Sequence, residues 1–172
     1  MDRLKQVNWL YHFTDFRNIQ SIRDLDGLWS TSKLREMEVN FHPGGNQHSL
    51  DADEMFGMDE YVHLCFTTKH PMAYLAQQDG RIEKLQWIYV DDPGPLFEIE
   101  GVKFTPGVAN KSGMTPCPIA DVRESLDVAA IGYLDWSVGD NYQRRQAIEK
   151  CEVLVPNHLP LKFFQRLFPK NG

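Results

Sequence analysis

A glutamate stands inside an apolar run near the carboxyl-terminal end of the chain. Residues 150–156 (KCEVLVP) have the composition of a strand, and Glu152 places a carboxylate among side chains that such a strand would bury. A charge in a low-dielectric interior is unfavourable unless hydrogen bonds or a ligand offset it. Glu152 is therefore the first candidate for a functional group, and the open alternative is an edge-strand glutamate that points to water.

Other polar and aromatic segments can share this chemistry, although none of them forms a known catalytic motif. The sequence has no Gly-rich phosphate loop of either common pattern, no His-Glu-x-x-His and no Gly-x-Ser-x-Gly turn, which removes several enzyme classes. The segments that remain are Tyr11–Thr14, Gly44–Asn46, Tyr61–Phe66 with His70–Tyr74 behind it, and Asn110–Gly113.

The composition bounds the kind of protein that carries these segments. With 172 residues, 42% of them hydrophobic and 24% charged, the chain is expected to form one globular domain, residues 1–172. A net charge of -6 argues against coating of nucleic acid by a uniformly basic surface, although a local groove stays open. Three cysteines far apart fit neither a disulfide framework nor a zinc site, and we expect no metal.

No secretion signal or membrane segment is visible in the sequence. No basic region precedes an apolar one in Met1–Tyr11, and no apolar run approaches the length that spans a bilayer. We therefore expect a cytoplasmic protein without a membrane partner.

Strands and short helices follow one another without the regular order of a parallel α/β fold. The expected strands are Asn8–Phe13, Tyr61–Thr67, Leu85–Val90, Leu96–Ile99, Val102–Phe104 and Cys151–Val155, and the expected helices are Asp15–Leu25, Pro71–Gln77, Ile119–Ser125, Tyr142–Glu149 and Leu161–Phe168. A long irregular stretch is expected from Ser30 to Asp59, and loops of that length are usually functional or disordered. The mixture predicts an α+β fold with mostly antiparallel sheets.

Together, these segments resemble the DarT family of DNA ADP-ribosyltransferases, toxins that transfer ADP-ribose from NAD to a base in single-stranded DNA and are paired with a macrodomain antitoxin. The resemblance runs from about Leu10 to about Phe164. It rests on the order of the opening Tyr-His-Phe-Thr strand, the Tyr-Val-x-Leu-x-Phe strand followed by Pro-Met-x-Tyr, and the late Glu-Val-Leu-Val-Pro strand. It implies the ADP-ribosyltransferase fold, in which two small sheets and flanking helices form a cleft for NAD.

The resemblance also implies roles for individual residues. Glu152 matches the catalytic glutamate, and His12, which we group with it as catalytic, matches a first-strand position that meets NAD, as does Thr14. Met72 and Tyr74 match the segment beside the nicotinamide. Departure of nicotinamide leaves an oxocarbenium-like sugar, which a nearby carboxylate stabilises as it does in glycosidases. The alternatives are a core histidine at position 12 and a packing tyrosine at position 74.

The chain departs from the family pattern in two ways. Many relatives carry an arginine before the Tyr-Val strand that helps to place NAD, and no arginine occurs here in residues 37–59. Asn46 and Ser49 occupy that stretch and are predicted to bind NAD, and Arg35 is the nearest cationic candidate. Lys150 stands where arginine-modifying transferases carry the first glutamate of their Glu-x-Glu pair, so an arginine side chain is a poor candidate for the acceptor.

The segment before the Glu152 strand is where transferases of this fold usually select the acceptor. Trp136 and Tyr142 are predicted to stack an unpaired base, and Arg144 and Arg145 to meet backbone phosphate. The alternative is a core tryptophan and a solvated helix face. A single-stranded acceptor avoids the cost of unstacking a base from a duplex.

The sequence therefore predicts a toxin-like transferase that uses NAD as co-substrate, modifies a base of single-stranded DNA and releases nicotinamide without a metal. Its expected partners are the acceptor strand and a macrodomain antitoxin. Three alternatives stay open: an NAD glycohydrolase, an RNA-directed transferase of the same fold, and a non-catalytic module that binds NAD or nucleic acid.

Overall fold

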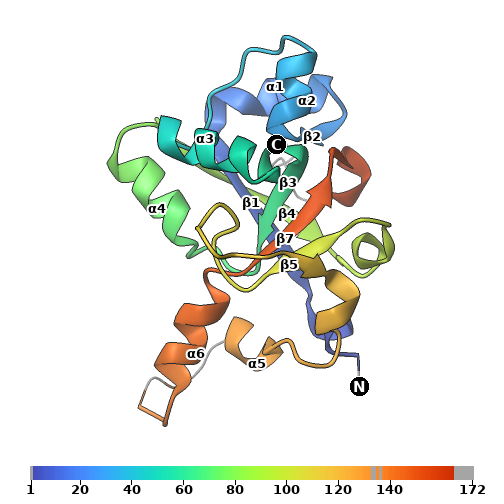
Figure 1. The fold of residues 1–172 in the computed structure, drawn as a ribbon, viewed down its shortest axis with the longest axis vertical. Coiled ribbons are helices and arrows are strands. Elements are labelled where there is room, and N and C mark those ends of the chain that lie inside the picture. The colour runs from blue at the N-terminus through green and yellow to red at the C-terminus, as the bar shows by residue number, and fades with distance from the viewer. Residues whose placement is uncertain (1, 133–134, 136, 165–172) are drawn as a thin grey trace, which may run out of the picture.

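Two antiparallel sheets form the centre of the computed structural model, which describes residues 2–132, 135 and 137–164 (Figure 1). The larger sheet has six strands in the order β4-β1-β3-β7-β5-β6, and the smaller pairs β2 with β8. The strands are β1 Trp9–Asp15, β2 Gly27–Trp29, β3 Tyr61–Cys65, β4 Leu85–Asp91, β5 Lys103–Thr105, β6 Cys117–Pro118, β7 Glu152–Pro156 and β8 His158–Pro160. Every strand pair of the described residues is antiparallel, which confirms the expected α+β class.

Short helices flank the two ends of the larger sheet. Helices α1 to α3 lie at one end, α5 and α6 lie at the other, and α4 lies to one side (Figure 1). The helices are α1 Ile19–Asp24, α2 Thr31–Glu36, α3 Gln47–Met55, α4 Pro71–Gln78, α5 Val128–Ile131 and α6 Asn141–Ile148, and the 3-10 turns are Arg3–Gln6, Phe16–Asn18, Met58–Glu60, Pro95–Glu98, Ile119–Val122 and Leu161–Phe163. None of the helices in the described part of the chain has the length and apolar character needed to cross a membrane.

The core is organised around β7, which lies between β3 and β5. Its residues Val153, Leu154 and Val155 are completely or almost completely buried, because both faces of this central strand are covered. A strand in that position has a continuous apolar run instead of an alternating pattern. Glu152 is thus the first residue of an interior strand, which excludes the alternative of an edge-strand glutamate.

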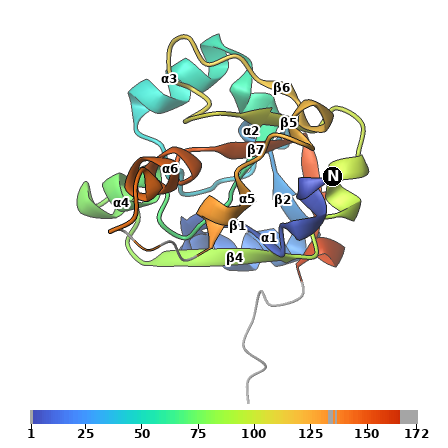
Figure 2. The same cartoon turned by 90° about the horizontal axis from the view of Figure 1, so that it is seen from below.

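The larger sheet opens between β1 and β3. Tyr11 pairs with Cys65 where the two strands meet, whereas β1 pairs with the edge strand β4 along its whole length (Figure 2). Away from that contact, His12 bridges the two strands by donating from Nδ1 to the carbonyl oxygen of His63 at 2.9 Å. This opening provides the space in which a cavity forms beside β1.

The stretch Ser30–Asp59 contains two helices, so the expectation of a long irregular segment was wrong. The side chains of Ser30 and Asn46 cap the first turns of α2 and α3. Neither helix contains a fully buried residue, and the apolar periodicity that predicts a helix from sequence is therefore weak.

Three shorter elements also differ from the sequence-based expectation. The expected strand Leu96–Ile99 is mostly a 3-10 turn, and the expected helix Ile119–Ser125 is a 3-10 turn over its first half. The expected closing helix Leu161–Phe168 starts as a 3-10 turn, and residues 165–168 lie outside the described residues. Apolar runs this short do not distinguish a strand from one turn of helix, because either geometry can bury them.

Gly27 provides a test of how closely the smaller sheet packs. Its φ is 135°, and a Cβ at this position would collide with the carbonyl oxygen of Leu159 on β8. We expect Gly27→Ala to lower the free energy of unfolding by at least about 3 kcal/mol in urea denaturation. Gly80→Ala is the matched control, since its φ is 70° and an added Cβ has nothing within 4 Å. It should lose only about 1 kcal/mol, and equal losses in the two variants would contradict the packing argument.

Candidate active site

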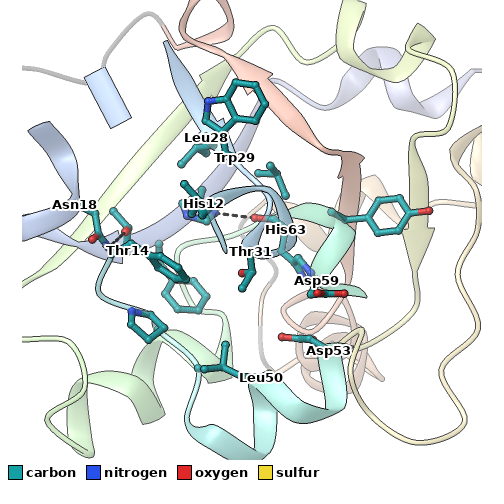
Figure 3. Close-up of a pocket in the computed structure, with 18 of the residues that line it drawn as sticks. His12, Thr14, Asn18, Leu28, Trp29, Thr31, Leu50, Asp53, Asp59 and His63 are labelled. Atoms are coloured by element: carbon teal, nitrogen blue, oxygen red, sulfur yellow. Dashed lines mark hydrogen bonds between the residues drawn. The ribbon is translucent and has the colours of Figure 1, made fainter. Parts of the chain in front are cut away.

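Glu152 lines a cavity on the open side of the sheet, although it belongs to the most buried strand. It lies opposite Cys65 on β3 and Thr105 on β5, and 7% of its side chain is exposed. The main cavity has a volume of about 210 Å³ and lies among β1, β2, α2 and α3 (Figure 3). A carboxylate with so little exposure depends on protein groups for the hydrogen bonds that water would otherwise supply.

His63 holds one oxygen of this carboxylate. Its Nδ1 lies 3.0 Å from Oε2 of Glu152, and its Nε2 lies 2.9 Å from the carbonyl oxygen of Met58. A carboxylate and a carbonyl oxygen both accept, so both ring nitrogens donate and the ring is an imidazolium. Burial lowers the pKa of His63, but the hydrogen bond and the charge of Glu152 outweigh burial and raise that pKa to about 9.

His70 and a backbone amide complete the surroundings of the carboxylate. Nε2 of His70 lies 3.0 Å from Oε1, in a direction that does not meet hydrogen-bond geometry, and the amide of Ala109 donates to Oε2 at 3.3 Å. Nδ1 of His70 accepts the amide N–H of Met72, so a neutral ring carries its proton on Nε2, toward Glu152. Burial raises the pKa of Glu152, yet its contacts with the two histidine rings lower that pKa to about 2, and the carboxylate is ionised at neutral pH.

His12 faces the same cavity as a neutral ring. Its Nδ1 donates to the carbonyl oxygen of His63, which leaves Nε2 as an acceptor. Burial lowers the pKa of His12 to about 4. Next to it on the cavity side, Thr14 accepts a hydrogen bond from Asn18 at 3.0 Å, and Asn18 also donates to the carbonyl oxygen of His42 at 2.8 Å. These bonds tie the segment before α3 to β1.

The main cavity carries no cation from lysine or arginine among the described residues that line it. Arg35 is the cationic side chain that the sequence offers in place of the arginine found in many relatives. Its guanidinium pairs with Glu54 at 3.1 Å and lies 4.0 Å from the carboxylate of Asp59. The guanidinium therefore links α2 to α3 and the turn behind it.

Asp53 on α3 adds a second carboxyl group to the cavity wall. Its Oδ1 is buried without a hydrogen-bond partner among the described residues. Burial raises the pKa of Asp53 to about 6, with the charge of Glu152 acting in the same direction and His63 acting against it. Asp53 and Asp59 are close neighbours in the cavity (Figure 3), and a group with this pKa can change its protonation state near neutral pH.

The structure brings some of the sequence-predicted residues together at this cavity. Glu152, His12, Thr14, Ser49 and Met72 all line it. Two others lie elsewhere: the side chain of Asn46 is exposed and caps α3 by accepting from the amide of Ser49 at 2.9 Å, and Tyr74 is 61% exposed on α4, outside the lining of the main cavity.

The predicted acceptor residues lie on or before α6. Trp136 is outside the described residues, and Tyr142 is 44% exposed. Arg144 pairs with both carboxylate oxygens of Asp127 at 2.7 Å, and Arg145 binds Glu149 at 2.8 Å together with the carbonyl oxygens of residues 130–132. Both guanidinium groups are thus engaged in holding α6 in place.

Sequence reasoning did not assign roles to His63, His70 or Asp53. The signal for His63 was present: directly opposite residues share a sheet face, Cys65 is opposite Glu152, and His63 is two residues from Cys65. Recognising it requires the pairing of β3 with β7, which one sequence does not give. Nothing in the local sequence of His70 or Asp53 points to the cavity.

A split antiparallel sheet with a buried glutamate at the start of an interior strand agrees with the ADP-ribosyltransferase fold that the sequence resemblance implies, and comparisons with known proteins identify the family. The chain belongs to the DarT family, described as "ssDNA thymidine ADP-ribosyltransferase, DarT", whose sequence model matches residues 11–172. A search of curated proteins finds no significant match.

Solved structures of DarT proteins share the fold. The chain is 16% identical to Thermus sp. 2.9 DarT in complex with ADP-ribosylated ssDNA, with a TM-score of 0.69, covering 93% of this chain and 80% of that one. It is 18% identical to Thermosipho africanus DarTG in complex with ADP-ribose, with a TM-score of 0.65, covering 91% of this chain and 42% of that one. The Thermus sp. 2.9 protein in complex with NAD+ matches with a TM-score of 0.61, at 16% identity and 92% and 80% coverage. These matches confirm the predicted ADP-ribosyltransferase-like fold.

The charge state of His63 gives a direct test of the site. In the wild type, NMR titration should show an imidazolium at pH 7 that loses its proton near the raised pKa of about 9. In Glu152→Gln the compensating charge is gone while burial remains, so the pKa of His63 should fall below its ordinary value and the ring should be neutral at pH 7. His12 serves as the internal control and should stay neutral in both proteins, and an unchanged His63 titration in the variant would rule out the ion pair.

Proposed function

We propose that this chain transfers the ADP-ribose group of NAD+ to thymidine in single-stranded DNA, with Glu152 as the catalytic glutamate. The observation that best supports this role is the ionised carboxylate of Glu152, which His63 and Ala109 hold at the wall of the main cavity. Membership of the DarT family supports the acceptor, and a related DarT in complex with NAD+ supports the donor.

The carboxylate acts while the bond between nicotinamide and ribose breaks. The bonding electrons leave with nicotinamide, and positive charge develops on the ribose ring and its anomeric carbon. Glu152 accepts a hydrogen bond from a ribose hydroxyl and stabilises that charge electrostatically. Because His63 and Ala109 hold Oε2, the carboxylate needs little reorganisation as the charge develops.

Four further lining residues are proposed to contact NAD+. His12 offers Nε2 as an acceptor for a hydroxyl, Thr14 and Ser49 offer hydroxyl groups, and Met72 offers apolar surface for a ring. Asn46 and Tyr74 are left out of this set because neither lines the main cavity. Without a lysine or arginine in the described lining, shape and hydrogen bonding carry more of the donor's affinity than ion pairing does.

Asp53 is proposed to take up the proton that the acceptor loses. Thymidine has one ring N–H, at N3, because N1 already carries the deoxyribose. When N3 bonds to the anomeric carbon, that proton must leave. Glu152 is a poor acceptor with a pKa of about 2, and the ring of His63 is already protonated. Asp53, whose pKa is about 6 and whose Oδ1 has no described partner, accepts the proton and returns it to solvent.

The similarity to DarTG supports a toxin-like role with a partner that counteracts it. This chain covers 42% of that longer protein, which is in complex with ADP-ribose. We propose a macrodomain antitoxin as the partner and the cytoplasm as the place where the toxin meets NAD+ and DNA.

Glu152→Gln tests the proposed reaction. Wild-type protein incubated with NAD+ and a thymidine-containing single strand should give a product heavier by one ADP-ribose in mass spectrometry. Glu152→Gln should reduce the rate by about a hundredfold or more while the protein stays folded. Glu60→Gln makes the same chemical change on an exposed residue and should act like the wild type. An active Glu152→Gln variant would reject the catalytic role.

The same assay separates the alternatives. Adducts on RNA and not on DNA would favour an RNA-directed transferase, and free ADP-ribose without any adduct would favour an NAD glycohydrolase. Binding of NAD+ without turnover would favour a non-catalytic module.

Asp53→Asn tests proton removal through the pH dependence of the transfer rate. The carboxylate form dominates above the pKa of about 6, so the wild-type rate should rise as pH increases through that value. Asp53→Asn should be about a hundredfold slower and should lack this rise. Asp51→Asn, on the exposed side of the same helix, should keep the wild-type profile. A wild-type profile in Asp53→Asn would exclude Asp53 as the proton acceptor.

A further inference from the structure

Aromatic rings cover the face of the β1–β4 edge that is turned away from the core. Leu10, Ile88 and Val90 are completely buried on the core side of these strands. The residues that alternate with them are aromatic and only half-buried: Tyr11 and Phe13 on β1, and Trp87 and Tyr89 on β4. Phe13 also lines the main cavity. We call these four residues the aromatic face.

The four rings form a connected row. Tyr11 is opposite Tyr89, with ring centroids 5.3 Å apart, and Phe13 is opposite Trp87, with centroids 5.8 Å apart. Tyr11 also contacts Trp87 at 6.4 Å. Edge-on contacts of this kind fix the rings to one another and give a rigid aromatic surface at low cost in side-chain entropy.

A second hollow lies beside the aromatic face and is separated from Glu152 by His70. It lies between α4 and β4 and is lined by residues that include Lys69, His70, Tyr74 and Trp87. His70 lines the main cavity as well, and its Nε2 lies 3.0 Å from Oε1 of Glu152. Phe13 stacks on His70 with centroids 6.0 Å apart. One layer of side chains therefore separates the second hollow from the site of reaction.

We propose that the single-stranded acceptor lies along the aromatic face and the second hollow, with unpaired bases stacked on Trp87 and Tyr89 and the next nucleotide entering the main cavity beside His70. This proposal rests on the proposed function and adds the path of its acceptor. Aromatic side chains stack every kind of base, but only when the base is unpaired. Such a surface thus selects single strands over duplexes.

The charges around the aromatic face fit binding by stacking more than binding by phosphate contacts. Lys69 is an exposed cation at the second hollow, and Lys84 immediately precedes β4. At the other end of β4, the exposed carboxylate of Asp92 repels phosphate. The acceptor strand is therefore expected to occupy the Leu85 end of β4 and to stop before its acidic end. With few phosphate contacts, its affinity should depend only weakly on salt.

Binding of a fluorescein-labelled, thymidine-containing single strand tests the path. Glu152→Gln serves as the background, so that the strand stays unmodified while anisotropy is measured. Added Trp87→Leu or Tyr89→Leu should each weaken binding about tenfold, whereas Trp87→Phe and Tyr89→Phe should stay within about twofold, since they keep a ring. Phe56→Leu, which removes an exposed ring at the end of α3, should leave binding unchanged. Circular dichroism and thermal melts confirm that each variant is folded.

The outcomes separate this proposal from the proposed function. Unchanged binding in both leucine variants, or equal losses in the leucine and phenylalanine variants, would overturn the path. Transfer kinetics in the Glu152 protein add the second readout: Tyr89→Leu should raise the KM for the strand with little change in kcat. If no strand is ever modified but the leucine variants bind it more weakly, the proposed acceptor path is supported and the proposed transfer reaction is rejected. If the strand is modified with the same KM in the leucine variants, the transfer reaction stands and the path falls.

Discussion

The ion pair between Glu152 and His63 is the interaction on which the site depends. A carboxylate at the start of an interior strand would be strongly unfavourable without it, because burial opposes the charged form of both partners. The pair sits where the sheet opens between β1 and β3, and that opening also leaves backbone groups without strand partners. His63 compensates both the buried charge and the opened backbone: its ring donates to the carboxylate of Glu152, and its carbonyl oxygen accepts from His12. The opening of the sheet and the ionised state of Glu152 thus both depend on His63.

Asp53 is a carboxyl group of the main cavity whose protonation state can change near neutral pH. His63 and Glu152 compensate each other, so the protonation of Asp53 changes the net charge of a cavity that also contains the carboxyl group of Asp59. The described lining of the cavity holds no lysine or arginine, whose charge would lower the pKa of Asp53 as that of His63 does.

Sequence reasoning identified the residues of the main cavity that stand out in the local pattern. A charge inside the apolar run of β7 identified Glu152, and the Tyr-His-Phe-Thr order placed His12 and Thr14 on the first strand, where both line the main cavity. His70 and Asp53 were not identified, because only tertiary contacts bring them to the cavity. His70 caps α4 and lies next to Glu152, and Asp53 lies on a helix that buries no residue fully. The aromatic alternation of β1 was visible, but its meaning depended on which strand pairs with it. Only the register with β4 places Tyr11 against Tyr89 and Phe13 against Trp87.

The fate of the two arginines on α6 shows why charge in a sequence is a weak guide to a nucleic-acid surface in an acidic protein. Arg144 and Arg145 were predicted to contact phosphate. A guanidinium has a fixed set of N–H donors, and here they donate to Asp127, Glu149 and backbone carbonyls. Releasing them for phosphate would leave those carboxylates and carbonyls unpaired, which opposes the exchange. The rings of β1 and β4 lose no hydrogen bond when a base stacks on them. An acidic chain can therefore hold a polyanion through its bases, provided that the strand is single, and this makes the edge of the sheet a better candidate for the acceptor path than the basic helix beside it.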